Sequence, residues 1–186
     1  GQSVRQDFYL LPACALFDDD VESGAGSWYA EGSWAISTES ANSPTHAWSD
    51  SPGSTYGNNL NVSLISPPLD LTAASGTQLS FWHTYDLENG YDYAYVEYST
   101  DGGTSWETAG TYNGAGQTAW SQVTLPLPAL DGAAGALIRF RLYSDGSVTA
   151  DGWHVDDIQV IAGHPSCFTP LAPAAAWEAS SPSNIS

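Results

Sequence analysis

Carboxylates are the side chains in this sequence that could do chemistry together. The chain has 21 Asp and Glu residues, and they stand in short clusters among apolar residues, as in Asp156-Asp157, rather than in one long run. Carboxylate oxygens supplied in this way are the ligands that a hard cation such as calcium takes in proteins. Acidity for solubility would explain the total but not the clustering. The pattern therefore predicts cation binding.

Four histidines raise the question of a zinc site or a hydrolytic triad: His46, His83, His154 and His164. The sequence contains no H-E-x-x-H, G-x-S-x-G or C-x-x-C motif. His83 and His154 fall in segments with a strand pattern, where a hydrogen-bonded core histidine is the ordinary outcome. Asp156 and Asp157 point to opposite faces of a strand, so they do not flank one glycosidic bond. We expect no enzyme activity.

Aromatic residues are abundant, with eight Trp and ten Tyr, and some could stack on a sugar ring. Tryptophans inside strand patterns are better explained as core: Trp34, Trp48, Trp82 and Trp153. Those nearer to turns are candidates for ligand stacking: Tyr29, Tyr56, Tyr91, Tyr112 and Trp120. Carbohydrate binding is therefore an alternative function that the sequence leaves open.

The segment from Ser99 to Trp106 matches the Asp-box pattern S-x-D-x-G-x-[ST]-W. Its Asp organises a tight turn, its glycines take positive φ, and its Trp packs beneath the hairpin. In sialidases this hairpin recurs once per propeller blade, and a single copy cannot build a propeller. The segment is therefore predicted to be structural.

The charge balance excludes two classes of partner. Arg5, Arg139 and Arg141 are the only basic residues apart from histidines, and the net charge is −18. Such a chain repels phosphate backbones and anionic lipids. No stretch of 18 apolar residues occurs, so no segment is expected to span a membrane. We expect neither nucleic-acid binding nor membrane insertion.

Two cysteines, Cys14 and Cys167, bracket the central part of the chain. They could be free thiols, but their placement suggests one bridge that ties the ends of a domain together. A disulfide indicates an oxidising, extracytoplasmic setting. We therefore expect an extracellular or cell-surface location.

Strand patterns dominate, and no 12-residue window shows a helical period with end caps. Apolar and polar residues alternate in segments 78–85, 91–98, 136–143 and 153–160. Gly, Asn, Asp and Pro punctuate the gaps between them. Many short strands with frequent turns predict an all-β sandwich or barrel.

The ends of the chain differ from its centre. Residues 1–13 contain an alternating strand that resembles the last strand of carboxypeptidase regulatory modules of bacterial surface proteins. Residues 168–186 form a linker rich in Pro, Ala and Ser, with an ending that resembles the opening strand of a polycystic-kidney-disease-type repeat. The main domain is assigned to residues 14–167, with neighbours expected on both sides.

Residues 17–162 resemble the bacterial relatives of the meprin/A5/mu (MAM) domain, which occur C-terminal to immune inhibitor A-type metallopeptidases and in multidomain surface proteins. The matching segments run the length of the domain: Asp19-Asp20-Val21-Glu22-Ser23-Gly24, His46-Ala47-Trp48-Ser49-Asp50, Leu64-Ile65-Ser66-Pro67-Pro68-Leu69, Leu79-Ser80-Phe81-Trp82, Val96-Glu97-Tyr98-Ser99 and Asp151-Gly152-Trp153-His154-Val155-Asp156-Asp157-Ile158. The resemblance implies a two-sheet antiparallel jelly-roll sandwich.

This family resemblance also implies adjacent first and last strands, which would bring Cys14 close to Cys167. In similar jelly rolls a divalent ion ties these strands together. Carried over, the resemblance implies calcium ligands at Glu22, Asp50 and Asp157, then at Asp20 and Asp156. A second site would draw on Asp86, Glu88, Asp92 or Asp145. The alternative is that these acids only cap turns and strand ends.

Three functions follow from these patterns. The first is a non-catalytic, calcium-stabilised adhesion or accessory module of a bacterial surface or secreted multidomain protein, with neighbouring domains or identical subunits as partners. The second is a carbohydrate-binding module, which requires an exposed aromatic pair with carboxylate or amide partners in a groove. The third is a subunit of an extracellular filament, in which the strand at residues 2–10 completes the sheet of a neighbouring subunit.

Overall fold

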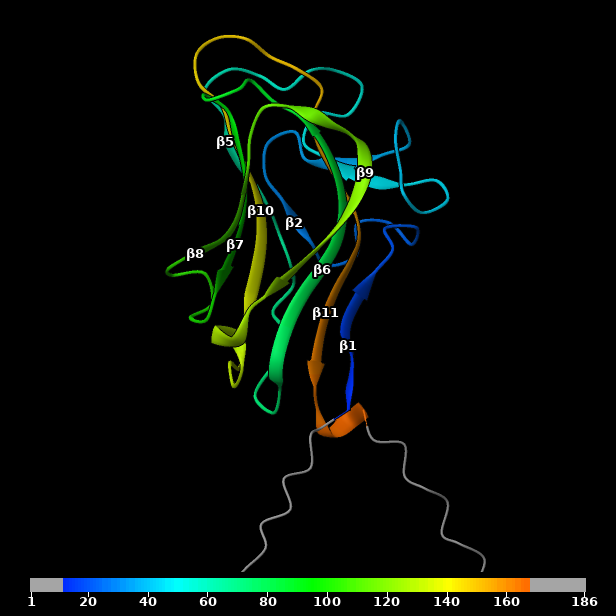
Figure 1. Ribbon diagram of the computed structural model, residues 1–186, viewed down its shortest axis with the longest axis vertical. Helices are drawn as coiled ribbons and strands as arrows, with labels where there is room; N and C mark the ends of the chain where they lie inside the picture. Colours follow the sequence, from blue (N-terminus) through cyan, green and yellow to red (C-terminus); the bar gives the residue numbers. More distant parts are fainter. Residues whose placement is uncertain (1–11, 168–186) are drawn as a thin grey trace, which may run out of the picture.

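The chain folds as two antiparallel β-sheets packed face to face, as Figure 1 shows for the computed structural model. The structure describes residues 12–167, except for the side chains of residues 115–117. Two short 3-10 turns, η1 (Pro128–Leu130) and η2 (Pro165–Cys167), are the helical elements in this part of the chain. The prediction of an all-β antiparallel sandwich is confirmed.

The larger sheet has six strands. Its order is β3 (Ala35–Ser37), β4 (Ala47–Ser49), β11 (Gly152–Gly163), β6 (Ser75–Asp86) and β9 (Ala115–Pro126), with β1 (Ala13–Asp19) also paired to β11. The long central strands β6 and β11 contain two of the segments for which the sequence predicts strands.

The smaller sheet has five strands. Its order is β2 (Tyr29–Ala30), β5 (Asn61–Ile65), β10 (Leu137–Tyr143), β7 (Tyr93–Ser99) and β8 (Glu107–Tyr112). Strands β7 and β10 pair in register from Leu137 opposite Ser99 to Tyr143 opposite Tyr93. They correspond to the other two predicted segments.

The first and last described strands lie side by side, since β1 pairs antiparallel with β11 (blue and orange in Figure 1). Cα of Cys14 lies 5.7 Å from Cα of Cys167, and the two form a disulfide across a sequence separation of 153 residues. The bridge that the sequence suggested is confirmed. It fixes the two ends of the described domain to each other.

Aromatic side chains from both sheets meet in the core. The ring of Phe140 lies 5.2 Å from that of Phe81 and 5.5 Å from that of Trp153, both edge to face. Trp34, Trp48 and Trp153 are buried, as predicted. The core prediction for Trp82 is wrong: this residue is half-buried, because its neighbours Phe81 and His83 occupy the inward positions of β6.

The Asp-box segment forms the tight turn between β7 and β8. Both carboxylate oxygens of Asp101 accept bonds from Ser105, at 2.9 Å from its N–H and 2.6 Å from its hydroxyl. These bonds lower the pKa of Asp101 to about 2. The indole N–H of Trp106 donates to the carbonyl of Gly103. Gly103 has the positive φ expected of a glycine in this motif.

Two regions named by the sequence lie outside the described residues. These are the alternating segment at residues 2–10, with its predicted role in strand addition, and the linker at 168–186. The assignment of residues 1–13, 14–167 and 168–186 to separate units therefore stays a prediction. No helix among residues 12–167 is long and apolar enough to cross a membrane.

Candidate metal centre

Three carboxylates converge at the end of the smaller sheet, and we call them the carboxylate cluster: Glu88, Asp92 and Asp145. One oxygen from each lies within 4.8 Å of the other two. Asp92 immediately precedes β7 and Asp145 follows β10 by two residues. Because these strands pair with Tyr93 opposite Tyr143, the two acids must meet at the same end, at the top of Figure 1. The turn after β6 adds Glu88.

Hydrogen bonds hold the cluster in place. Asp92 is fully buried, and its carboxylate accepts from the Tyr56 hydroxyl at 2.6 Å and from the Asp145 N–H at 2.8 Å. The same tyrosine hydroxyl accepts from the Glu88 N–H at 3.1 Å. The side chain of Asn113 donates to the carbonyls of Glu88 and Asp92. Burial and the bond to Asp92 raise the pKa of Tyr56, so its hydroxyl stays a donor.

The cluster lacks a compensating positive charge. Oε2 of Glu88 is buried without a hydrogen-bond partner. Burial, followed by the charges of Asp145 and Asp92, raises the pKa of Glu88. Arg139 and Arg141, the two arginines in the described part of the chain, pair with Glu97 instead. A set of hard oxygen donors with one orphaned buried oxygen fits a divalent cation such as calcium.

Four of the five acids predicted as ligands lie elsewhere, around the loop formed by residues 42–46, and we call them the β1–β11 acids: Asp20, Glu22, Asp156 and Asp157. Glu22 accepts from the N–H groups of Thr45 and His46 at 2.9 and 2.8 Å and from the Thr45 hydroxyl. The His46 side chain, followed by these Thr45 bonds, lowers the pKa of Glu22 to about 2.

The aspartates of this group are similarly engaged. Asp156, which is fully buried, accepts from the N–H groups of Asn42, Ser43 and Asp157 at 2.8–2.9 Å. Burial raises the pKa of Asp156, and these bonds oppose the rise. The side chain of Asn42 donates to Asp157 at 2.7 Å, and the Glu22 N–H donates to Asp20 at 3.1 Å. The β1–β11 acids hold a loop through N–H donors, and their metal role stays a prediction.

Asp50, the fifth predicted ligand, has separate contacts. It is fully buried just after β4, and its Oδ1 accepts from the Trp153 N–H at 2.5 Å, whereas Oδ2 has no hydrogen-bond partner. Burial raises the pKa of Asp50 to about 7. The carboxylate lies so close to Gly152 that a Cβ there would stand 2.2 Å from Oδ1. Glycine is thus required at this position, where φ is +98°.

The five aromatic residues predicted to stack on a ligand lie in different surroundings. Tyr29 and Tyr91 are 63% and 60% exposed. For Tyr56 the prediction is wrong, because its ring is buried and its hydroxyl bonds to the carboxylate cluster. The half-buried ring of Tyr112 packs against His83 at 4.5 Å, and Trp120 donates to Ser40. No ring contact joins any two of these five residues within the described structure.

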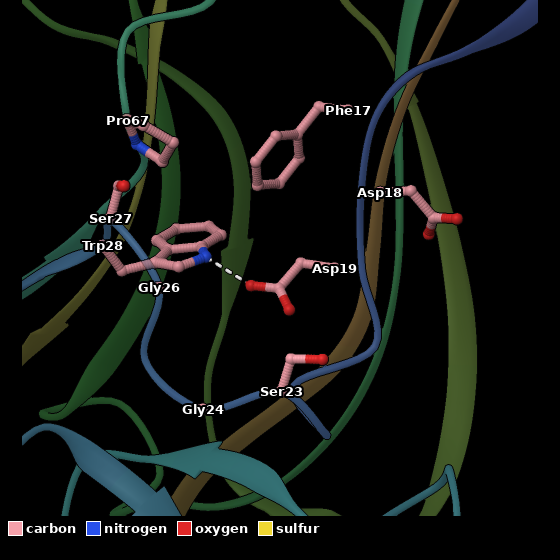
Figure 2. A pocket seen from close by; sticks show the side chains of 9 residues that line it. All are labelled: Phe17, Asp18, Asp19, Ser23, Gly24, Gly26, Ser27, Trp28 and Pro67. Carbon is pink, nitrogen blue, oxygen red and sulfur yellow. Dashed lines mark hydrogen bonds between the residues drawn. The ribbon is translucent and has the colours of Figure 1, made fainter.

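A small cavity opens between β1 and the loop that leads to β2 (Figure 2). Its volume is about 230 Å³, and its apolar walls come from Phe17, Trp28 and Pro67. The Trp28 indole N–H donates to Asp19 at 2.5 Å, and the Phe17 ring packs edge-on against the indole. Trp28 and Asp19 thus satisfy each other, and although Asp18, Ser23 and Ser27 also line the cavity, its surface is mainly apolar.

From the sequence, the residues of the carboxylate cluster were predicted only as a second metal site, after the five acids named first. Asp92 stands inside an alternating strand pattern and reads as one polar residue of a strand. The signal that could have identified it is its place directly before one strand of a pair, with Asp145 two residues after the other. The fourth acid suggested for that site, Asp86, is not part of the cluster.

Comparisons with known proteins agree with this architecture. The chain is 29% identical over 170 residues to Bacillopeptidase F of Bacillus subtilis (strain 168), which covers 85% of the chain and 12% of the relative. The chain thus spans a small part of that relative's length.

Solved structures share the fold at low sequence identity. The K3 adhesin domain of Lys-gingipain from Porphyromonas gingivalis superposes with a TM-score of 0.58 at 21% identity, covering 80% of this chain and 99% of that one. The CBM22-1 xylan-binding domain from Paenibacillus barcinonensis Xyn10C superposes with a TM-score of 0.55 at 12% identity, covering 82% and 96%. The model of the immune inhibitor A-like MAM domain family matches residues 43–176, and the chain belongs to this family.

Proposed function

We propose that this chain is a non-catalytic extracellular module for adhesion or for accessory support of neighbouring domains, and that calcium stabilises it. The carboxylate cluster carries the calcium part of this proposal. Three carboxylates converge on one point without an arginine from residues 12–167 beside them, and one of their oxygens is buried without a partner in the same part of the chain. A bound divalent ion would neutralise their mutual repulsion.

Calcium at this place would act on loops rather than on a reaction. Glu88 and Asp92 belong to the connection between β6 and β7, and Asp145 to the connection after β10. Tyr56, from a third loop, bonds to Asp92. An ion held by the three carboxylates would therefore link three loops at one end of the sandwich and reduce their motion.

The setting and role rest on two further observations. The disulfide between Cys14 and Cys167 favours an oxidising, extracellular location. The chain belongs to the family of the immune inhibitor A-like MAM domain and shares its fold with adhesin domains of Lys-gingipain. These relatives support an attached module, with neighbouring domains or identical subunits as partners.

Thermal unfolding in excess calcium and in chelator tests the proposal. The ion should raise the unfolding temperature by many degrees, since a ligand at 100 times its dissociation constant adds about 2.7 kcal/mol. Glu88→Gln should lose most of this response. Glu107→Gln is the matched control: it removes the same charge from an exposed strand residue and keeps an acceptor for the Tyr98 hydroxyl.

Each result has a consequence. If calcium and chelator give the wild-type chain the same transition, the calcium proposal is wrong. A full response in Glu88→Gln would place the ion away from the carboxylate cluster. Magnesium at the same concentration should stabilise less, because the smaller ion demands near-octahedral geometry and dehydrates reluctantly.

A further inference from the structure

The outer face of the five-stranded sheet gathers three partly or fully exposed tyrosines and both described arginines. Ala94, Val96, Phe140 and Leu142 are fully buried on the inner face of β7 and β10. The residues that alternate with them therefore project outward. With Asn61 of β5, these outward residues form what we call the tyrosine–arginine face: Asn61, Tyr93, Tyr95, Glu97, Arg139, Arg141 and Tyr143.

Three tyrosines lie together on this face. The rings of Tyr93 and Tyr95 stack with centroids 5.7 Å apart and an interplanar angle of 22°. Tyr143 stands opposite Tyr93 in the strand register and is 42% exposed. The Tyr93 hydroxyl donates to the Gly90 carbonyl at 3.1 Å, which fixes the position of its ring. The face thus presents ordered aromatic surface to solvent.

A charged network beside the tyrosines pairs two arginines with one carboxylate and so keeps one positive charge in excess. Glu97 accepts from Nε of Arg139 at 2.6 Å and from Nε and Nη2 of Arg141 at 2.8 Å each. Nη1 of Arg141 donates to the Asn61 side chain at 3.2 Å, and its guanidinium lies 4.3 Å above the Tyr95 ring. The guanidinium has five N–H groups, of which these bonds use three. Two remain as rigidly placed donors.

Fixed aromatic rings beside fixed hydrogen-bond donors are the chemistry that recognises a sugar: the rings pack on the C–H faces of a pyranose and the donors meet its hydroxyls. The charge of the protein selects among sugars. The net charge of the chain is −18, and Glu97 already neutralises one of the two arginine charges of the face, so the molecule as a whole would repel a polyanion. We propose that the tyrosine–arginine face binds neutral polysaccharide.

This inference goes beyond a calcium-stabilised module, since it assigns the molecule a ligand. It also meets part of the requirement set for a carbohydrate-binding module, an exposed aromatic pair with carboxylate or amide partners in a groove. Tyr143 is exposed beside the half-buried pair Tyr93 and Tyr95, and Asn61 supplies the amide. The carbohydrate site is thus placed on residues other than the five aromatic ones that the sequence singled out.

Affinity electrophoresis of the full chain in calcium, through gels that contain xylan, β-1,4-galactan or mixed-linkage β-glucan, tests the proposal. At least one neutral polysaccharide should retard the wild-type chain. Tyr143→Ala should weaken that binding about tenfold, the loss expected for one stacking contact. Tyr95→Ala should also weaken it, because it removes the ring that holds the Arg141 guanidinium in place. Trp82→Ala removes a half-buried aromatic residue from the other sheet and should leave binding unchanged.

Polygalacturonate provides the charged comparison and should not retard the chain. The proposal is overturned if no neutral polysaccharide retards the wild-type chain, if polygalacturonate is preferred, or if both tyrosine variants bind as the wild type does. Unfolding temperatures of all variants in calcium separate lost binding from lost folding. Because binding is scored on folded protein, its failure would leave the calcium proposal standing.

Discussion

The two groups of acids in this molecule have similar compositions and opposite arrangements. Each of the β1–β11 acids accepts from at least one N–H donor, which belongs to the backbone except at Asp157, where it is the side-chain amide of Asn42. The carboxylates of the cluster face one another, and Oε2 of Glu88 has no donor. The first arrangement is complete without an ion, whereas the second becomes electrostatically favourable only when a cation is added.

The shifts in acidity follow the same difference. Hydrogen bonds from His46 and Thr45 lower the pKa of Glu22 to about 2. Burial, together with the charges of Asp145 and Asp92, raises the pKa of Glu88. Thus the number of acids in a segment does not identify a metal site; the donors already bound to their oxygens decide it.

The largest expected effect tests whether the two groups are independent. The disulfide closes a loop of 153 residues beside β1 and β11, at the opposite end of the molecule from the carboxylate cluster. The double variant Cys14→Ser/Cys167→Ser should lose about 5 kcal/mol of unfolding free energy in the chain-entropy model. Urea unfolding in calcium and in chelator should show an unchanged increment from calcium. If calcium no longer stabilises the double variant, the carboxylate cluster is coupled to the part of the molecule around β1 and β11.

The second effect is a loss of unfolding free energy at low pH that comes from His83. It must be distinguished from the losses that protonation of the two groups of acids causes. Burial lowers the pKa of His83 to about 4, and its Nδ1 accepts from the Trp153 indole at 3.2 Å. Because the folded pKa lies below the usual 6.5, its contribution is fully present above pH 6.5 and is lost as the pH falls towards 4. That loss amounts to about 3 kcal/mol. The unfolding free energy of His83→Gln should not fall in this way between pH 6.5 and 4. If it falls as steeply as in the wild type, other groups cause the loss.

Most of the fold could be predicted because its signal is local. Leu79, Phe81 and His83 stand at every second position and mark the inner face of β6. The cysteines at the two ends of the domain anticipated the pairing of β1 with β11. The short strands β2, β3 and β4, with two or three residues each, are too short to produce a readable alternation.

The candidate sites were harder to predict, because they depend on strand register and on which donors surround a side chain. Glu88 and Asp145 are 57 residues apart in the sequence, and only the pairing of β7 with β10 brings them together. The tyrosine–arginine face did have a local signal. Ala94 and Val96 alternate with Tyr93 and Tyr95, which already turns the tyrosines outward.

A matched pair of buried aspartates gives the third effect. Asp156→Asn places an amide against three N–H donors, so its free energy of unfolding in chelator should fall by about 2 kcal/mol. Its stabilisation by calcium should be unchanged. Asp92→Asn should cost less in chelator, because it relieves repulsion in the carboxylate cluster, and should lose the calcium response. Thermal unfolding of both variants, with and without calcium, measures the two quantities. If Asp156→Asn lost the calcium response and Asp92→Asn kept it, the ion would bind at the β1–β11 acids instead.

The smallest effect concerns Glu22, which is partly exposed and therefore screened by solvent. Because hydrogen bonds lower its pKa to about 2, its contribution is present above pH 4.5 and is lost as the pH falls through 2. Glu22→Gln should therefore lower the unfolding temperature by about 2–4 °C at pH 7 in chelator, and by nothing near pH 2. A scan of unfolding temperature against pH measures this difference. A deficit that stays constant across the scan would mean that Glu22 acts through packing rather than charge, and the contrast with Glu88 would then rest on geometry alone.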